Sequence, residues 1–172
     1  MKRFLLCFIV AIGVISLLTV NVCTAQQTKK VPLEEQVKIK ILQNKQISIK
    51  NLKVTYEGNG EIKLEGTTDL YASSHLAAVE AVSIDGVNFV DNNIEVIHVT
   101  EKTDAEIQKE IQVEVKKIIK EDAMKNISIR VKDGSVDIQG TSLDKEAINK
   151  IYDRIIWIPG IIYVRKGIKE AK

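Results

Sequence analysis

Gly60-Glu-Ile62-Lys-Leu64-Glu-Gly66-Thr67 and Gly134-Ser-Val136-Asp-Ile138-Gln-Gly140-Thr141 are two copies of one pattern, 74 residues apart. The same offset relates glycines and apolar residues on both sides of this stretch: Gly86 and Gly160, Val87 and Ile161, Phe89 and Tyr163, Leu33 and Ile107, Val37 and Ile111. Self-similarity at a fixed spacing is typical of a duplicated structural unit. The sequence therefore predicts two domains of one fold.

Within each copy the pattern predicts the order helix, strand, strand, helix, strand. Leu52 to Tyr56 and Glu61 to Glu65 alternate as a β-hairpin does, and Gly58-Asn59-Gly60 between them suits a turn with positive φ. The opening segment, around Val37 to Ile41, alternates as a strand does, but its acidic start and length favour a helix. We expect an α+β fold of two tandem αββαβ units, each a three-stranded sheet covered on one face by two helices.

The second helix of the second unit is predicted over about Asp144 to Ile158, with one apolar face. That face consists of four residues: Ile148, Ile151, Tyr152 and Ile155. The offset places smaller side chains at the same positions of the first unit: Ser74, Ala77, Ala78 and Ala81. Gly86 and Gly160 follow the two helices, where positive φ is usual.

The second copy carries a resemblance to a known family. The stretch Val131 to Thr141, with Asp133-Gly134 at its turn and Gly140-Thr141 at its end, precedes a helix and then Gly160-Ile-Ile-Tyr-Val164. This pattern resembles the BON family, a bacterial module of osmotically inducible and nodulation proteins. The longer turn of the first copy, Glu57 to Gly60, departs from the family pattern.

The resemblance covers nearly all of Leu33 to Glu170 and organises the chain as follows: residues 1–25 signal peptide, 26–32 linker, 33–99 first BON domain, 100–103 linker, 104–170 second BON domain. It implies a non-enzymatic cell-envelope module connected with osmotic stress and membrane integrity. The similar dual-BON outer-membrane lipoproteins imply, further, that the second domain binds anionic phospholipid.

The N-terminus predicts export. Lys2 and Arg3 precede an apolar run from Phe4 to Leu18, and Cys23-Thr24-Ala25 offers small residues to a signal peptidase. An uncleaved membrane anchor remains an alternative, because the run approaches the length that spans a bilayer. So does acylation of Cys23, although Val22 departs from the small residue that a lipobox requires. We expect a periplasmic protein, peripheral to the membrane.

Removal of residues 1–25 would take both cysteines, so no disulfide is predicted in the mature chain. The remaining charges divide unequally. Residues 26–101 hold 8 basic and 11 acidic residues, whereas residues 102–172 hold 15 and 12. A neutral whole argues against bulk nucleic-acid binding and leaves room for a local patch.

Catalysis, metal and cofactor have little support in the sequence. The two histidines, His75 and His98, fall in different elements and neither has a cysteine or second histidine at ligand spacing. Ser73 and Ser74 adjoin His75, but adjacency in sequence does not supply the geometry of a catalytic triad. We expect no enzyme activity, no cofactor and no metal site.

One surface is predicted to bind lipid. Lys150, Arg154 and Trp157 stand at i, i+4 and i+7 of the last helix, away from its apolar face. A basic stripe that ends in an indole is typical of a helix at a membrane interface. The alternatives are that Trp157 fills the interface between the two units or covers its own core. The leading hypothesis is an anionic phospholipid surface as partner, and the other is docking of an envelope protein.

Overall fold

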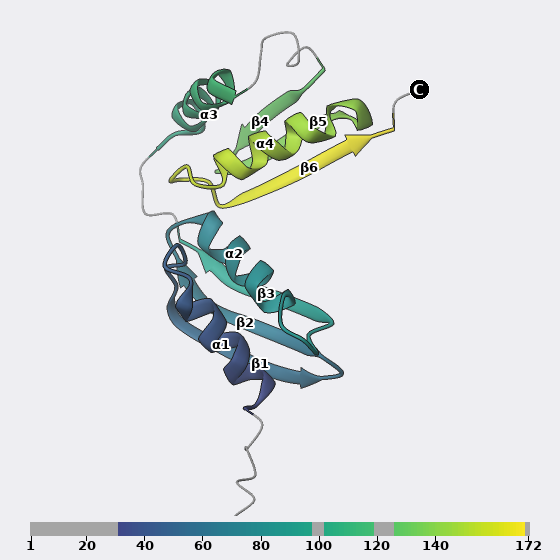
Figure 1. The fold of residues 1–172 in the computed structure, drawn as a ribbon. Helices are drawn as coiled ribbons and strands as arrows, with labels where there is room; N and C mark the ends of the chain where they lie inside the picture. The colour runs from purple at the N-terminus through teal and green to yellow at the C-terminus, as the bar shows by residue number, and fades with distance from the viewer. Residues whose placement is uncertain (1–30, 98–101, 119–125, 171–172) are drawn as a thin grey trace, which may run out of the picture. The chain divides into compact units, whose positions relative to one another are not determined.

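The computed structural model describes residues 31–97, 102–118 and 126–170 (Figure 1). The predicted signal peptide, its alternative as an anchor, and Cys23 lie outside these residues, as does His98. In the described part of the chain, no helix has the length and the apolar character needed to cross a membrane.

The first domain has the predicted order. Its elements are α1 (Leu33–Gln43), β1 (Lys50–Gly58), β2 (Glu61–Thr68), α2 (Tyr71–Val82) and β3 (Phe89–Val96). The strands form one sheet in the order β1-β2-β3, with β1 antiparallel and β3 parallel to the central β2. Both helices lie over one face of this sheet (Figure 1). The core between them contains Val37, Ile41, Ile62, Leu64, Ala77, Ala81 and Ile94.

The second domain repeats this architecture. Its elements are α3 (Asp104–Ile118), β4 (Ser128–Lys132), β5 (Ser135–Thr141), a short 3-10 helix η2 (Ser142–Asp144), α4 (Lys145–Ile155) and β6 (Tyr163–Lys169). The sheet order is β4-β5-β6, again with one antiparallel and one parallel pair. Its core includes Ile107, Ile111, Val115, Val136, Ile138, Ile148, Ile151 and Ile155.

The predicted fold class is thus confirmed: two successive αββαβ units, each with its helices on one sheet face. Ile62 and Val136, which the offset equates, are both buried in central strands. The predicted buried face of α4 is confirmed as well, since Ile148, Ile151 and Ile155 are fully buried.

The opening segments, whose apolar pattern fits both a strand and a helix, are helices. In α3 the buried residues Ile107, Ile111 and Val115 recur every four residues, as one helix face requires. The start of α3 is a capping box, in which the Glu106 carboxylate accepts the Thr103 backbone N–H at 2.8 Å and the Thr103 hydroxyl accepts the Glu106 N–H at 3.3 Å. These contacts fix the helix start.

The chain leaves α4 earlier than the sequence predicts. Gly86 and Gly160 have the expected positive φ, 95° and 96°. However, α4 ends at Ile155, not at Ile158, and a turn follows. Pro159 explains this difference, because a proline has no N–H to donate to the Ile155 carbonyl and its ring would clash with that carbonyl in a longer helix. The Ile155 carbonyl instead accepts the Ile158 N–H at 2.9 Å. The prediction of one continuous helix through Trp157 was wrong.

Candidate functional site

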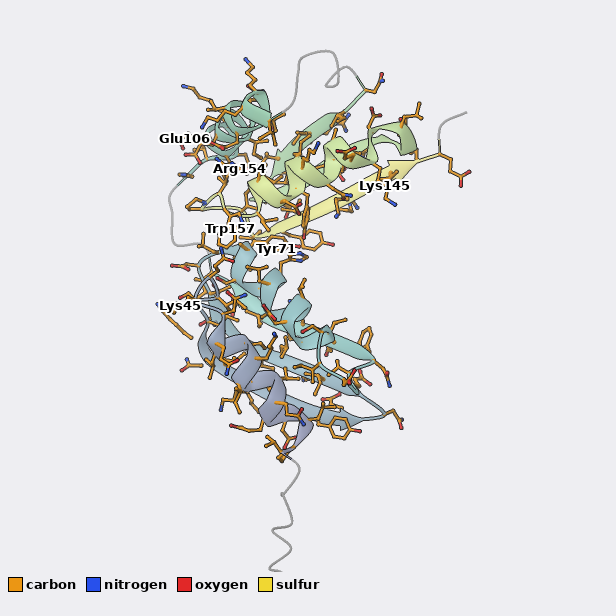
Figure 2. All side chains as sticks on the ribbon, in the orientation of Figure 1. Lys45, Tyr71, Glu106, Lys145, Arg154 and Trp157 are labelled. Carbon is orange, nitrogen blue, oxygen red and sulfur yellow. The ribbon has the colours of Figure 1, made fainter. Side chains whose placement is uncertain are left out.

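The three predicted lipid-binding residues lie on one side of the second domain. Lys150 and Arg154 project from the exposed side of α4, whereas Trp157 lies in the turn that follows the helix. Arg154 and Trp157 stand near each other at the end of α4, far from Lys145 at its start (Figure 2). Trp157 is 37% exposed, so its indole is neither fully buried nor free.

A groove of about 460 Å3 runs beside this indole. Its walls come from α3, α4 and the turn: Lys109, Val113, Glu114, Arg154, Trp157 and Pro159. Val113 is 48% exposed and adds apolar surface to the groove that Trp157 lines. The groove is therefore an apolar opening with charged residues around it, and all of these lining residues belong to the second domain.

Arg154 is held by a carboxylate on the neighbouring helix. Its Nε lies 2.7 Å from Oε2 of Glu114 on α3. Hydrogen bonds from Lys117 and from Arg154 lower the pKa of Glu114 below its ordinary value. The guanidinium thus joins α3 to α4 across the groove, a contact that the spacing along α4 does not reveal.

Lys150 is paired too. Its Nζ lies 2.7 Å from Oε1 of Glu146, one turn earlier in α4, and this hydrogen bond lowers the pKa of Glu146. The cations Lys109, Lys150 and Arg154 are accompanied by the carboxylates Glu110, Glu114 and Glu146. Surface ion pairs of this kind contribute about 0–1 kcal/mol each. The patch is mixed in charge, not the basic stripe that the sequence suggests.

The ion pair across the helices has a counterpart in the first domain. Lys40 of α1 lies 3.6 Å from Glu80 of α2, and Asn44 donates a 2.8 Å hydrogen bond to the same carboxylate. The 74-residue offset equates Lys40 with Glu114 and Glu80 with Arg154. The ion pair between the two helices stands at equivalent positions in both domains, but the basic and the acidic residue have changed places. Comparison of the two copies at this offset was the signal that could have identified Glu114 as the partner.

The serines beside His75 hold the first domain together. Ser73 Oγ accepts the Ser48 backbone N–H at 3.1 Å, and Asn92 Nδ2 donates to Ser74 Oγ at 3.0 Å. Both serines are buried. Among residues 31–97, 102–118 and 126–170, no group of three or more histidine, cysteine, aspartate or glutamate side chains could hold a metal ion.

Comparison with curated proteins found no significant match. Among solved structures, the C-terminal domain of CdsD, the structural protein of the type III secretion system of Chlamydia trachomatis, aligns at 11% identity with a TM-score of 0.33 and covers 83% of this chain and 99% of that chain. A second structure of CdsD aligns at 10% identity and a TM-score of 0.33, covering 80% and 91%.

A family model gives the clearer result, and it matches the part of the chain that holds the first domain. From α1 to the end of β3, this stretch has the helix-strand-strand-helix-strand order described above. Residues 30–98 match the model of the BON domain, so the first domain of this chain is similar to the BON family.

Proposed function

We propose that this chain is an exported, non-enzymatic protein of the cell envelope, built from two BON domains, whose second domain contacts phospholipid surfaces. The family match to residues 30–98 and the common fold of the two domains support the tandem assignment. The signal-peptide pattern of residues 1–25 supports export to the periplasm. A role in envelope integrity or osmotic stress is what the family resemblance implies.

The observation that carries the lipid proposal is the half-exposed Trp157 beside the exposed Val113 and Pro159. An indole prefers the headgroup depth of a bilayer, because it is apolar at one end and donates a hydrogen bond at the other. Moving such a side chain out of water contributes about 2 kcal/mol. Cations near an anionic surface add about 1 kcal/mol each when they are free.

The carboxylates around the groove limit the attraction between its cations and an anionic surface. Glu114 and Glu146 already neutralise Arg154 and Lys150, so an anionic lipid gains little from displacing them. We therefore expect weak, reversible binding in which insertion of Trp157 dominates and the anionic share of the bilayer matters less.

Trp157 is the only tryptophan of the chain, so its fluorescence reports directly on the site. Residues 26–172 are mixed with vesicles of phosphatidylcholine alone and with phosphatidylglycerol added. The proposal expects a blue shift of emission and co-sedimentation with both vesicles. Trp157→Ala should abolish co-sedimentation and change stability by about 1 kcal/mol or less, because the indole is partly exposed.

Leu143→Ala is the matched control. Leu143 is a large apolar residue of the same domain, 86% exposed, in the 3-10 helix before α4. Its truncation should leave vesicle binding unchanged. Two results would contradict the lipid proposal. One is that the emission shows no blue shift with either kind of vesicle, and the other is that Trp157→Ala and Leu143→Ala lose vesicle binding equally.

The balanced charges favour docking of an envelope protein as the second candidate. Apolar grooves that contain tryptophan and arginine, with a polar rim, resemble the energetic centres of protein interfaces. A photo-crosslinking residue at position 113 should then capture one defined envelope protein in cells, and the same residue at position 143 should not. Capture at both positions, or at neither, would argue against this candidate.

A further inference from the structure

Each domain leaves one sheet face uncovered by its helices. On the central strand of the first domain, Glu61, Lys63 and Glu65 alternate with the buried Ile62 and Leu64, so they point to the open face. On β5 of the second domain, Ser135, Asp137 and Gln139 alternate in the same way with Val136 and Ile138. The strand register extends these two open faces to their neighbours.

The two open faces have opposite charge. That of the first domain carries three cations and four carboxylates: Lys50, Lys53, Lys63, Glu61, Glu65, Asp91 and Glu95. That of the second domain carries four cations and one carboxylate: Arg130, Lys132, Arg165, Lys169 and Asp137. The charges of these side chains sum to −1 and +3. Part of the second face forms a depression of about 470 Å3, whose charged lining residues are Arg130, Lys132, Arg165, Asp133 and Asp137.

The charges are exchanged position by position. At the 74-residue offset, Asp91 corresponds to Arg165 and Glu95 to Lys169. Lys63, which pairs with Asp91 in the register of the first sheet, corresponds to Asp137, which pairs with Arg165 in the second. Across the first sheet the row therefore reads cation, Lys63, then carboxylate, Asp91, whereas across the second sheet it reads carboxylate, Asp137, then cation, Arg165.

We propose that the open face of the second domain binds the open face of the first domain in a second copy of this chain. Sheets pack face to face about 10 Å apart. An arrangement that lays one row over the other places Lys63 against Asp137 and Asp91 against Arg165. Two exposed aromatic residues at equivalent positions, Phe89 and Tyr163, add apolar surface to the two faces.

A second copy suits the basic face better than a membrane does. A bilayer with anionic lipid has a net negative surface, which attracts the four cations of this face but repels Asp137 in its middle. Asp137 is held there by Arg165, whose Nε lies 3.1 Å from its Oδ1, and by Gln139. The first domain offers a cation, Lys63, at the corresponding place.

The contact is head to tail, because it uses a different surface on each partner. Each copy can then contact two others, and the assembly grows as a ring or a chain. Its strength depends on exposed charges, so it should weaken as salt shortens the Debye length from about 30 Å at 0.01 M to about 3 Å at 1 M. This proposal is independent of the lipid proposal, which concerns the opposite, helical side of the second domain.

The test exchanges residues between the two faces in the chain from Gln26 to Lys172. Arg165→Asp with Lys169→Glu makes the second face like the first, so both faces are acidic. Asp91→Arg with Glu95→Lys makes the first face like the second, so both are basic. Sedimentation velocity at low salt measures the association constant, and circular dichroism checks that each variant is folded.

The parent should self-associate at low salt and dissociate at high salt. Each variant alone should associate at least about tenfold more weakly, since the contact of residue 91 with residue 165 becomes repulsive and the two faces then carry net charge of the same sign. An equal mixture of the two variants should restore assembly, because acidic faces then meet basic ones. Lys116→Glu with Lys145→Glu changes the charge equally on the helices and should have no effect.

Three results would overturn the proposal. The first is a parent chain that stays monomeric at every concentration and salt, which would also be the result if the two faces paired within one chain. The second is a mixture that associates no better than its components, so that the exchanged charges serve only ion pairs inside each domain. The third is loss of vesicle binding, without loss of self-association, in the Arg165→Asp and Lys169→Glu variant.

Discussion

The second helix of each domain, α2 in the first and α4 in the second, packs on its sheet through different interactions. In the first domain α2 meets the sheet through small residues such as Ala77 and Ala81, and Asn92 of β3 donates hydrogen bonds of 3.0 Å to the backbone and side-chain oxygens of Ser74. In the second domain α4 meets the sheet through Ile148, Ile151 and Ile155, all fully buried. The two copies share the spacing of the buried positions but not their size or polarity.

The fold therefore depends more on the positions of the buried side chains than on their size or polarity. Apolar burial secures α4, whereas small side chains and hydrogen bonds secure α2. The same holds for charge, because the Lys40–Glu80 and Glu114–Arg154 pairs occupy one place with exchanged polarity. Substitutions that make one domain like the other at a single position test the comparison.

Ile151→Ala should have the largest effect, because it gives the second domain the residue that stands at position 77 of the first. Truncating a fully buried isoleucine removes its transfer energy and leaves a cavity. We expect the free energy of unfolding to fall by about 2–5 kcal/mol in urea titrations. Ile168→Ala, at a position 40% exposed, is the control and should change it far less. Parent-like unfolding of Ile151→Ala would show that this helix face is not the core.

The reverse change, Ala77→Ile, should overpack the first domain. Ala77 is fully buried, so three added carbon atoms must displace their neighbours. The expected loss is about 1–3 kcal/mol, again from urea titrations. Val79→Ile on the same helix, at a position 50% exposed, should be nearly neutral. Equal stability of Ala77→Ile and the parent would mean that α2 can move away from its sheet without loss.

The hairpin turns differ as well, and Asp104→Ala tests how each is held. In the second domain the Asp104 carboxylate accepts the backbone N–H groups of Asp133 and Gly134 at 2.8 and 2.9 Å. In the first, Asn88 Nδ2 donates instead to the Asn59 carbonyl at 2.8 Å. Loss of bonds to a charged group should cost about 1–3 kcal/mol, against about 1 kcal/mol for Asn88→Ala.

Thermal unfolding of these two variants, followed by circular dichroism, checks the order. The surface variant Asp153→Ala serves as a control for loss of an aspartate in the second domain. A smaller loss of stability in Asp104→Ala than in Asn88→Ala would show that the hairpin turn of the second domain does not depend on the Asp104 carboxylate.

The smallest expected effect concerns pH. Hydrogen bonds from Lys117 and Arg154 hold the pKa of Glu114 below its ordinary value. A depressed pKa in the folded state means that this stabilisation is present above the pKa of the unfolded chain and is lost as pH falls through the folded value. An NMR titration of Glu114 should show the low pKa, and Arg154→Gln should raise it only in part, because Lys117 remains. An unchanged pKa in that variant would contradict the ion pair.

Most of the fold could be predicted from the sequence, because the alternation of apolar and polar residues and the turn residues determine each element from nearby positions. Residues close together in the sequence were enough to predict three features: the hairpin of Val136 and Ile138, the buried face of α4 and the glycines after both helices. The end of α4 was the exception. There Pro159 ended the helix early and placed Trp157 in a turn, although the proline was visible in the sequence.

The candidate site could be predicted only in part. Lys150 and Arg154 lie together on the exposed side of α4, as the helical spacing predicted, and Trp157 lines the same groove as Arg154 although it stands in the turn after the helix. The partner of Arg154 could not be read from α4, because Glu114 lies 40 residues earlier in the chain and approaches only when α3 packs beside α4. Val113 and the groove arise from the same packing.

The unequal helix faces also bear on how the chain reaches its native state. Two copies of one fold in a single chain are together throughout folding, and exchange of equivalent elements is a characteristic failure of such repeats. If α2 docked on the second sheet, its alanines would leave cavities where isoleucines belong, and α4 on the first sheet would be too large. Because each cavity costs about 2–5 kcal/mol and overpacking about 1–3 kcal/mol, the size difference directs each helix to its own sheet.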